Sequence, residues 1–272
     1  MFPLSGKNFP SDPQVLADSI REALAAVLSL PDGGKAVKVE GAELPQLKRI
    51  KVDLSGAEIS ATEPPPKPKP SGKRTPGLHV TSLEVVGHPI KYEKNKLDLT
   101  LKARDVSCDF ARDKKGNALL VLSDAREGSV EAKMSKADIE ALLKRVAEEL
   151  AKEQKVTVQD LKLTLTSSGP RSVAADVRIT ARKMLVSGTI VLKGRLDVDD
   201  ELNATLSDLS ASGDGMVGSM VAGLVHKKVK PHEGRVIPLM AFSLGDVALR
   251  DLKITVKKDV QVNAAFGSGN GR

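Results

Sequence analysis

Few side chains in this sequence have the types and spacing that catalysis needs. The four histidines, His79, His88, His226 and His232, lack the short regular spacing of metal ligands, and no serine or cysteine lies in a recognised nucleophile motif. Cys108 is the only cysteine, which excludes an intramolecular disulfide and argues against a cysteine-based zinc site. We expect it to be a small side chain packed in a strand. The sequence therefore predicts no catalytic and no metal-binding residues, and a protein that is not an enzyme.

A glycine motif precedes the last predicted helix. Residues 213–218 read G-D-G-M-V-G, which matches the G-x-G-x-x-G fingerprint of dinucleotide-binding proteins. That fingerprint requires a parallel βαβ unit, whereas the flanking segments have the pattern of antiparallel strands, and Asp214 would repel a pyrophosphate. We interpret these glycines as a flexible start of the helix.

An acidic run follows one of the predicted strands. Asp197, Asp199, Asp200 and Glu201 supply oxygen ligands of the kind that hard cations prefer. Nothing in the run resembles an EF-hand loop, and short acidic segments are common at turns between strands. The sequence favours an acidic turn.

The segment with the most informative side chains is the helix predicted over 214–230. Its apolar surface is formed by Met216, Val217, Met220, Val221 and Leu224. Three lysines follow this surface: Lys227, Lys228 and Lys230. Adaptable methionine side chains beside a lysine cluster suit an acyl chain with an anionic head group. A buried helix whose last-turn lysines stabilise the helix dipole has the same pattern, so the sequence leaves both interpretations open.

Two further helices are predicted. The clearest covers 135–154, where one stripe at i, i+3, i+4 and i+7 spacing is formed by Ile139, Leu142, Leu143, Val146 and Leu150. Ser135 can cap this helix together with Asp138. The other helix, over 13–30, begins with Ser11, Asp12 and Pro13. Because the central helix stands alone between long runs of strands, we expect its stripe to lie against a sheet.

Most of the remaining chain alternates apolar and polar residues with the period of antiparallel strands. Segments that start at 78, 156 and 247 (LHVTSLEVVG, VTVQDLKLTL, VALRDLKITV) share a frame in which the alternation slips by one residue. Such a slip predicts a bulge and a strongly curved sheet. We expect the proline-rich basic run 64–76 to be an exposed, extended loop, and 267–272 to be a flexible tail.

Composition limits the class of partner. The net charge of +7 favours nucleic acid or an anionic membrane surface, but the chain has only five Phe, one Tyr and no Trp. Single-stranded nucleic acid is usually bound by stacking on aromatic rings, so we predict no nucleic-acid partner. The sequence has neither a signal peptide at its start nor a run of ~20 apolar residues. We expect a cytoplasmic or peripheral membrane location.

From about Val37 to Val262 the order of motifs resembles the LmeA-like phospholipid-binding family, within the tubular lipid-binding (TULIP) superfamily. The resemblance rests on GAELPQLKRIKVDLSGAEIS, GSVEAKMSKADIEALLKRV, VTVQDLKLTL, MLVSGTIVLKGRLDV and VIPLMAFSLGDVALRDLKITV. It implies a long, curved antiparallel sheet around helices, with an apolar lipid groove and non-covalent phospholipid binding. Members of the family carry an export signal or anchor, which this sequence lacks, so an envelope location is implied by the resemblance alone.

These observations combine into one prediction: a single α+β domain over 1–272, with a strongly curved antiparallel sheet wrapped around amphipathic helices. We expect it to bind, and by extension to transfer, phospholipid or a similar acyl lipid, with no other cofactor. The resemblance implies a groove lined by Leu142, Leu143, Val146, Leu150, Val186, Ile190, Leu192, Met216, Val217, Met220, Val221 and Leu224. Lys227, Lys228 and Lys230 would bind the head group. The alternative is a structural or adaptor protein with a solid core, whose basic surface binds a protein or an acidic polymer; the oligomeric state stays open.

Overall fold

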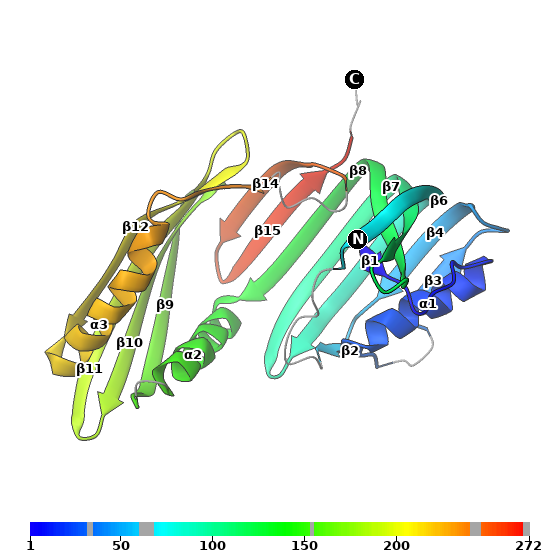
Figure 1. Ribbon diagram of the computed structural model, residues 1–272. Coiled ribbons are helices and arrows are strands. Elements are labelled where there is room, and N and C mark those ends of the chain that lie inside the picture. The colour runs from blue at the N-terminus through cyan, green and yellow to red at the C-terminus, as the bar shows by residue number, and fades with distance from the viewer. Residues whose placement is uncertain (32–34, 60–67, 153–154, 240–245, 269–272) are drawn as a thin grey trace. The chain divides into compact units, whose positions relative to one another are not determined.

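The computed structural model describes residues 1–272 except for 32–34, 60–67, 153–154, 240–245 and 269–272. The chain divides into two compact units (Figure 1). Unit 1 comprises Met1–Lys133, Ala241–Asp251 and Asn263–Arg272, and unit 2 comprises Met134–Met240 and Leu252–Val262. This division is finer than the single domain over 1–272 that we expected from the sequence.

The larger sheet contains ten strands of the described chain. They are β1 (Phe2–Pro3), β2 (Leu28–Ser29), β3 (Val37–Glu40), β4 (Gln46–Asp53), β5 (Glu58–Ile59), β6 (Pro70–Tyr92), β7 (Asn95–Asp113), β8 (Ala118–Ser135), β14 (Leu249–Val256) and β15 (Asp259–Phe266). Seven of them follow the order β14-β15-β8-β7-β6-β4-β3. The β4–β6 pair is parallel, with Gln46 opposite His79, so the sheet is mixed rather than purely antiparallel as expected. The long connection from β4 to β6 is what permits a parallel pair.

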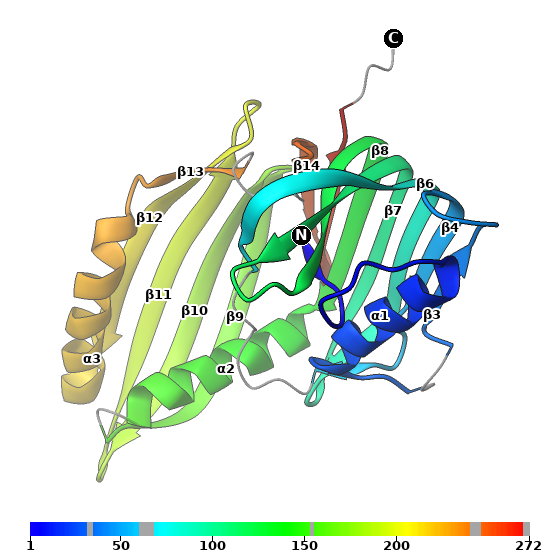
Figure 2. The same ribbon diagram turned by 45° about the vertical axis from the view of Figure 1, so that its right-hand side comes forward.

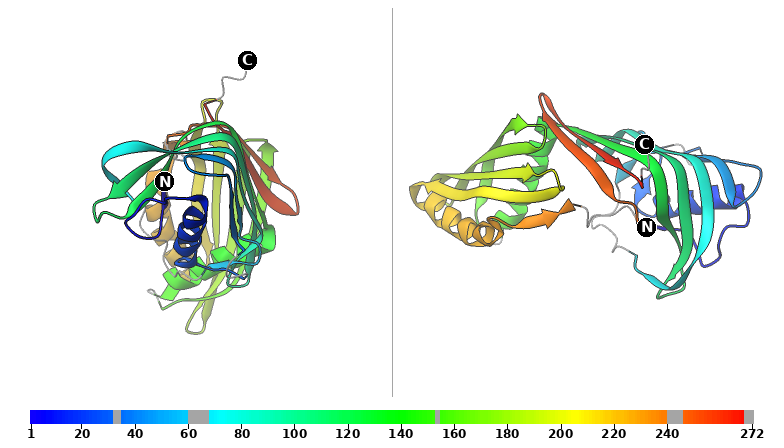
Figure 3. Two further views of the ribbon diagram at one scale, coloured as in Figure 1. Left: turned by 90° about the vertical axis from the view of Figure 1, so that its right-hand side faces the viewer. Right: turned by 90° about the horizontal axis from the view of Figure 1, so that it is seen from above.

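Helix α1 (Pro13–Ala25) lies along this sheet (Figure 3, left). Its predicted start is confirmed, because the Asp12 carboxylate accepts a hydrogen bond of 2.9 Å from the backbone N–H of Val15. The predicted end at residue 30 is wrong. The helix ends at Ala25 because Leu28–Ser29 pairs with β5 instead, which satisfies its backbone groups in the sheet.

The core of unit 1 is built mainly from β-strand residues together with Leu16, Ala17 and Ile20 of α1. Cys108 belongs to this core, as expected of a small strand residue. Burial and the neighbouring Asp109 raise the pKa of its thiol to about 12. The thiol is therefore neutral and inert at ordinary pH.

The predicted proline-rich loop is partly wrong. Residues 70–76 belong to β6, where Pro70 lies opposite Asp113 and Thr75 opposite Phe110. The register shifts on both sides of Thr75, which is where a strand tolerates proline. Residues 64–67 of the predicted loop, and 269–272 of the predicted flexible tail, lie outside the described residues. Gly267 and Ser268 are held by backbone hydrogen bonds to Ala248 and Ala125.

Unit 2 contains an antiparallel sheet in the order β13-β12-β11-β10-β9. Its strands are β9 (Thr157–Gly169), β10 (Ser172–Lys183), β11 (Val186–Val198), β12 (Asn203–Asp214) and β13 (Val236–Pro238). The helices α2 (Lys136–Lys152) and α3 (Gly215–Val229) lie on one face of this sheet, and a 3-10 turn, η1 (Lys230–His232), follows α3 (Figure 2). The predicted cap of α2 is confirmed: the N–H of Asp138 donates to Ser135 Oγ at 3.0 Å.

The predicted slip in strand alternation is confirmed in β9. Asp160 lies opposite Thr180 but Val158 lies opposite Ala181, which leaves Gln159 as the extra residue of a bulge. In the corresponding segment of β6 the register does not shift between Val80 and Leu83. For the third segment, and for strong curvature of the sheets, the expectation stays a prediction.

Candidate functional site

The face of the unit 2 sheet that carries the helices is apolar. Ile179 of β10 lies opposite Leu161 of β9 on one side and opposite Ile190 of β11 on the other. All three are buried, and they pack with Ala147 and Ala151 of α2 and with Val221 and Ala222 of α3. The next row along the strands, Leu163, Val177 and Leu192, is only half-buried. Of the three β11 residues predicted to line a groove, Ile190 and Leu192 therefore do lie under the helices.

Helix α2 turns its polar side toward the free edge of β9. The carboxylate of Glu140 accepts a 2.7 Å hydrogen bond from the N–H of Leu163, and Lys144 Nζ donates to the carbonyl of Gln159 at 3.2 Å. Strand β9 is the edge strand and its other side pairs with β10. These bonds fix the rotation of α2 about its axis.

That rotation leaves the large apolar side chains of α2 uncovered. Among the side chains of α2, those that pack on the sheet core are the small Ala147 and Ala151, and no residue of the helix is fully buried. Leu143, Val146 and Leu150 are 36%, 50% and 58% exposed. Leu142 is half-buried. The predicted stripe exists, but Leu143, Val146 and Leu150 stay exposed rather than entering a packed core.

Glycines bring α3 into direct contact with two strands. A methyl group on Gly218 would lie 2.5 Å from the carbonyl oxygen of Thr189 in β11. A methyl group on Gly213 would lie 2.0 Å from the carbonyl oxygen of Gly218. A methyl group on Gly188 would lie 2.4 Å from the backbone nitrogen of Gly218. Seen from above, α3 accordingly lies flat along the sheet (Figure 3, right). Gly213 and Gly218 of the G-x-G-x-x-G segment therefore permit close backbone packing, and the flexibility expected of this helix start stays a prediction.

The two faces of α3 match the two interpretations that the sequence left open. Val217 and Ala222 are buried against the sheet, with Val221 half-buried beside them. On the other side Met216, Met220 and Leu224 are 74%, 42% and 43% exposed and follow one line along the helix. One half of the predicted apolar surface is thus core and the other half is open.

The predicted lysine cluster lies at one end of this line. Lys227, Lys228 and Lys230 are exposed at the C-terminal end of α3, where positive charge stabilises the helix dipole. At 1.5 Å per residue, Lys227 is about 16 Å along the axis from Met216. The lysines therefore lie near Leu224, at the opposite end of the helix from Met216.

The turn between β10 and β11 carries the most exposed apolar side chains of the described chain. Met184 and Leu185 are 88% and 86% exposed, and Val186 beside them is 40% exposed. Val186, which was expected in the groove, is the first residue of β11, pairs with Lys183 and lies next to this turn. Arg182 and Lys183 precede the pair directly. Sequence reasoning missed the turn as a site, although two bulky apolar residues in a two-residue strand connection were a usable signal.

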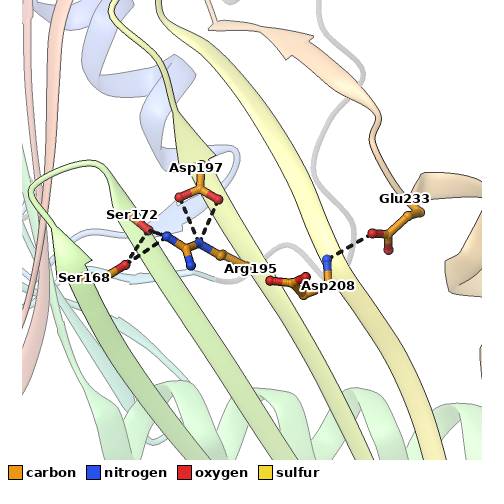
Figure 4. Close-up of polar contacts among 6 residues, drawn as sticks. All are labelled: Ser168, Ser172, Arg195, Asp197, Asp208 and Glu233. Carbon is orange, nitrogen blue, oxygen red and sulfur yellow. Dashed lines mark hydrogen bonds and ion pairs between the residues drawn. The ribbon is translucent and has the colours of Figure 1, made fainter.

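The opposite face of the unit 2 sheet is polar (Figure 4). Arg195 Nε donates to both carboxylate oxygens of Asp197, at 3.0 and 2.9 Å, and Arg195 Nη2 donates to the hydroxyl oxygens of Ser168 and Ser172. Hydrogen bonding by Ser172, and then the Arg195 guanidinium, lower the pKa of Asp197. A shallow cavity of about 240 Å³ lies beside this network, lined by β9, β10, β11 and Asp208 of β12.

The acidic run after β11 forms a turn, as the sequence favoured. Asp199 accepts hydrogen bonds from the backbone N–H and the side-chain amide of Asn203, which lower the pKa of its carboxyl group. Asp200 pairs with Arg171 at 2.7 Å. Within the part of the chain that the structure describes, no three His, Cys, Asp or Glu side chains are placed to share a metal ion.

A second cavity, of about 320 Å³, lies in unit 1. Lys35, Lys38 and Lys51 line it, together with Asp53 and Ser55. Neither cavity contains a residue predicted to bind lipid. An enclosed apolar groove stays a prediction, and most of the exposed large apolar side chains of the described residues lie on α2 and α3 and at the β10–β11 turn of unit 2.

Comparison with protein-family models, curated proteins and solved structures finds no match to this chain. Among the described helices, none combines the length and the apolar character needed to cross a membrane.

Proposed function

We propose that unit 2 binds phospholipid, or a similar acyl lipid, without covalent chemistry, on the sheet face between α2 and α3. One observation carries the proposal: each helix packs part of its apolar surface on the sheet and leaves large apolar side chains of the same surface exposed. The exposed set is Leu143, Val146, Leu150, Met216, Met220 and Leu224. An amphipathic helix ordinarily buries such side chains.

Covering this face with apolar groups would lower the free energy of the protein. Burying a Val, Leu or Met side chain stabilises by roughly 1.5–3 kcal/mol, which the isolated chain forgoes at each of these positions. An acyl chain lying on the half-buried row of Leu163, Val177 and Leu192 would supply the missing contact. Methionine suits this role because its flexible thioether adapts to chains of different length. Lys227 and Lys228, at the Leu224 end, offer positive charge to a phosphate.

The proposal is tested by lipid uptake. Purified protein is extracted and its lipids are identified by mass spectrometry, and transfer of a fluorescent phospholipid from vesicles to the protein is then measured. Val146→Glu and Met220→Glu should each lower uptake at least about tenfold, because each places an unpaired charge on the apolar face. Val15→Glu is the matched control, since Val15 is 44% exposed on α1 in unit 1 and should leave uptake unchanged.

Absence of lipid from the purified protein together with absence of uptake would contradict the proposal. So would undiminished uptake by folded Val146→Glu and Met220→Glu variants. A protein that takes up no lipid but binds a polyanion would support the structural or adaptor alternative instead.

A further inference from the structure

The β10–β11 turn is built against its own local preference. A two-residue connection between antiparallel strands favours Asn-Gly or Asp-Gly, because the backbone there enters the left-handed region. Here the connection is Met184-Leu185, and Met184 has φ 55°. A non-glycine residue is disfavoured in this region, because its Cβ lies too close to the following carbonyl oxygen. The Arg182 Nε donates a 2.8 Å hydrogen bond to the Met184 carbonyl, which holds the turn in this conformation.

Two further apolar residues share the turn's end of unit 2. Arg182 lies opposite Thr157, so the start of β9, and with it the C-terminal end of α2 that carries Leu150, lies at this end of the sheet. Thr189 lies opposite Asp214, so α3 also begins here with Met216. Figures 1 and 2 show both helix ends near the β10–β11 turn. The exposed apolar side chains of α3 therefore begin, and those of α2 end, at the same end of unit 2 as the β10–β11 turn.

The charges at the turn are positive. Residues 182–187 contain Arg182 and Lys183 and no acidic residue. The nearest carboxylate on α3, Asp214, is occupied as the helix cap and accepts from the N–H of Gly215 at 2.9 Å. Long basic side chains beside exposed apolar ones can reach lipid phosphates while the apolar groups enter the acyl region.

We propose that this end of unit 2 docks on an anionic phospholipid bilayer, with Met184 and Leu185 inserted at the boundary between head groups and acyl chains. Arg182 and Lys183 contact the head-group phosphates. The inference deepens the proposed function and rests on it, since docking at this end would bring Leu150 and Met216 close to the bilayer from which lipid is taken. Each basic residue adds attraction to an anionic surface.

The test is sedimentation of the full chain with vesicles made of equal parts phosphatidylcholine and phosphatidylglycerol. For the double variant Met184→Asn, Leu185→Gly, we expect vesicle binding to be at least about tenfold weaker, since two inserting side chains are removed. It introduces the residues that the turn prefers, so it should fold at least as well as the original chain. Val236→Ser is the matched control, because Val236 is a 56% exposed apolar residue elsewhere in unit 2. Lys183→Gln should weaken binding to these vesicles but not to vesicles of phosphatidylcholine alone.

A second measurement separates this inference from the proposed function. A short-chain phospholipid, supplied as monomers in water, should bind the turn variant as well as the original chain, whereas Val146→Glu should not bind it. If all variants bind the monomeric lipid equally but the turn variant loses vesicle binding, the docking proposal is supported and the proposed lipid site between α2 and α3 is contradicted. Vesicle binding by the turn variant equal to that of the original chain, or an equal loss in Val236→Ser, would overturn the docking proposal.

Discussion

Gly218 and Gly223 both lie in α3, but a methyl group would meet different surroundings at the two positions. At Gly218 it would press against the backbone of Thr189, whereas at Gly223 no atom lies within 4 Å. Glycine lowers helix stability by about 1 kcal/mol relative to alanine wherever packing does not intervene. The pair therefore separates helix propensity from the requirement for close contact with the sheet.

We expect Gly218→Ala to destabilise unit 2 by about 1–3 kcal/mol, because α3 must move off β11 to admit the methyl group. Gly223→Ala should instead stabilise it by up to about 1 kcal/mol. Urea unfolding followed by circular dichroism measures both. Equal effects of the two substitutions would show that α3 does not pack on β11 through Gly218.

At the scale of elements, α2 packs on its sheet without any fully buried side chain. Two alanines pack on the core, and Glu140 and Lys144 make hydrogen bonds to the edge of β9. Helices whose apolar face is unburied open at low free energy, because tertiary packing supplies most of the stability of a helix in a protein.

Backbone amides of α2 should accordingly exchange with solvent faster than those of β10, which pairs on both sides. Addition of phospholipid should slow exchange in α2 and leave α1 unchanged, and hydrogen-exchange mass spectrometry resolves the two helices. Protection of α2 equal to that of β10 in lipid-free protein would show that its apolar stripe is already covered.

The sequence was sufficient to locate α2 and α3 but not to orient them. Their apolar spacing and the Ser135 cap identify them as helices, yet the hydrophobic pattern alone indicates that the face with Leu143 and Val146 should be buried. Instead, the two hydrogen bonds from α2 to the edge of β9 set the rotation of the helix. Such bonds join residues that are far apart in the chain. The role of Gly218 was hidden for the same reason, because its contact with Thr189 exists only in the folded sheet.

At the scale of the whole chain, the strand-rich pattern predicted an α+β protein, and the bulge in β9 was visible as a slip in alternation. The parallel β4–β6 pair was not predictable, because strand alternation has the same period in parallel and antiparallel pairs. The extension of β6 into residues 70–76 was hidden by its prolines, which ordinarily mark loops. The division into two compact units could not be predicted from composition either, because both units are built from the same aliphatic residues.

The two units have cores of unequal size, and this sets the order in which they should unfold. The main buried cluster of unit 1 contains 21 residues and that of unit 2 contains seven, two of which lie in β9. Because stability follows buried apolar area, the described strands of unit 2 should lose hydrogen-exchange protection at a lower urea concentration than β6 and β7. Gly218→Ala should shift the transition of unit 2 alone. Simultaneous loss of protection in β10 and β7, unchanged in order by this substitution, would mean that the two cores unfold as one cooperative structure.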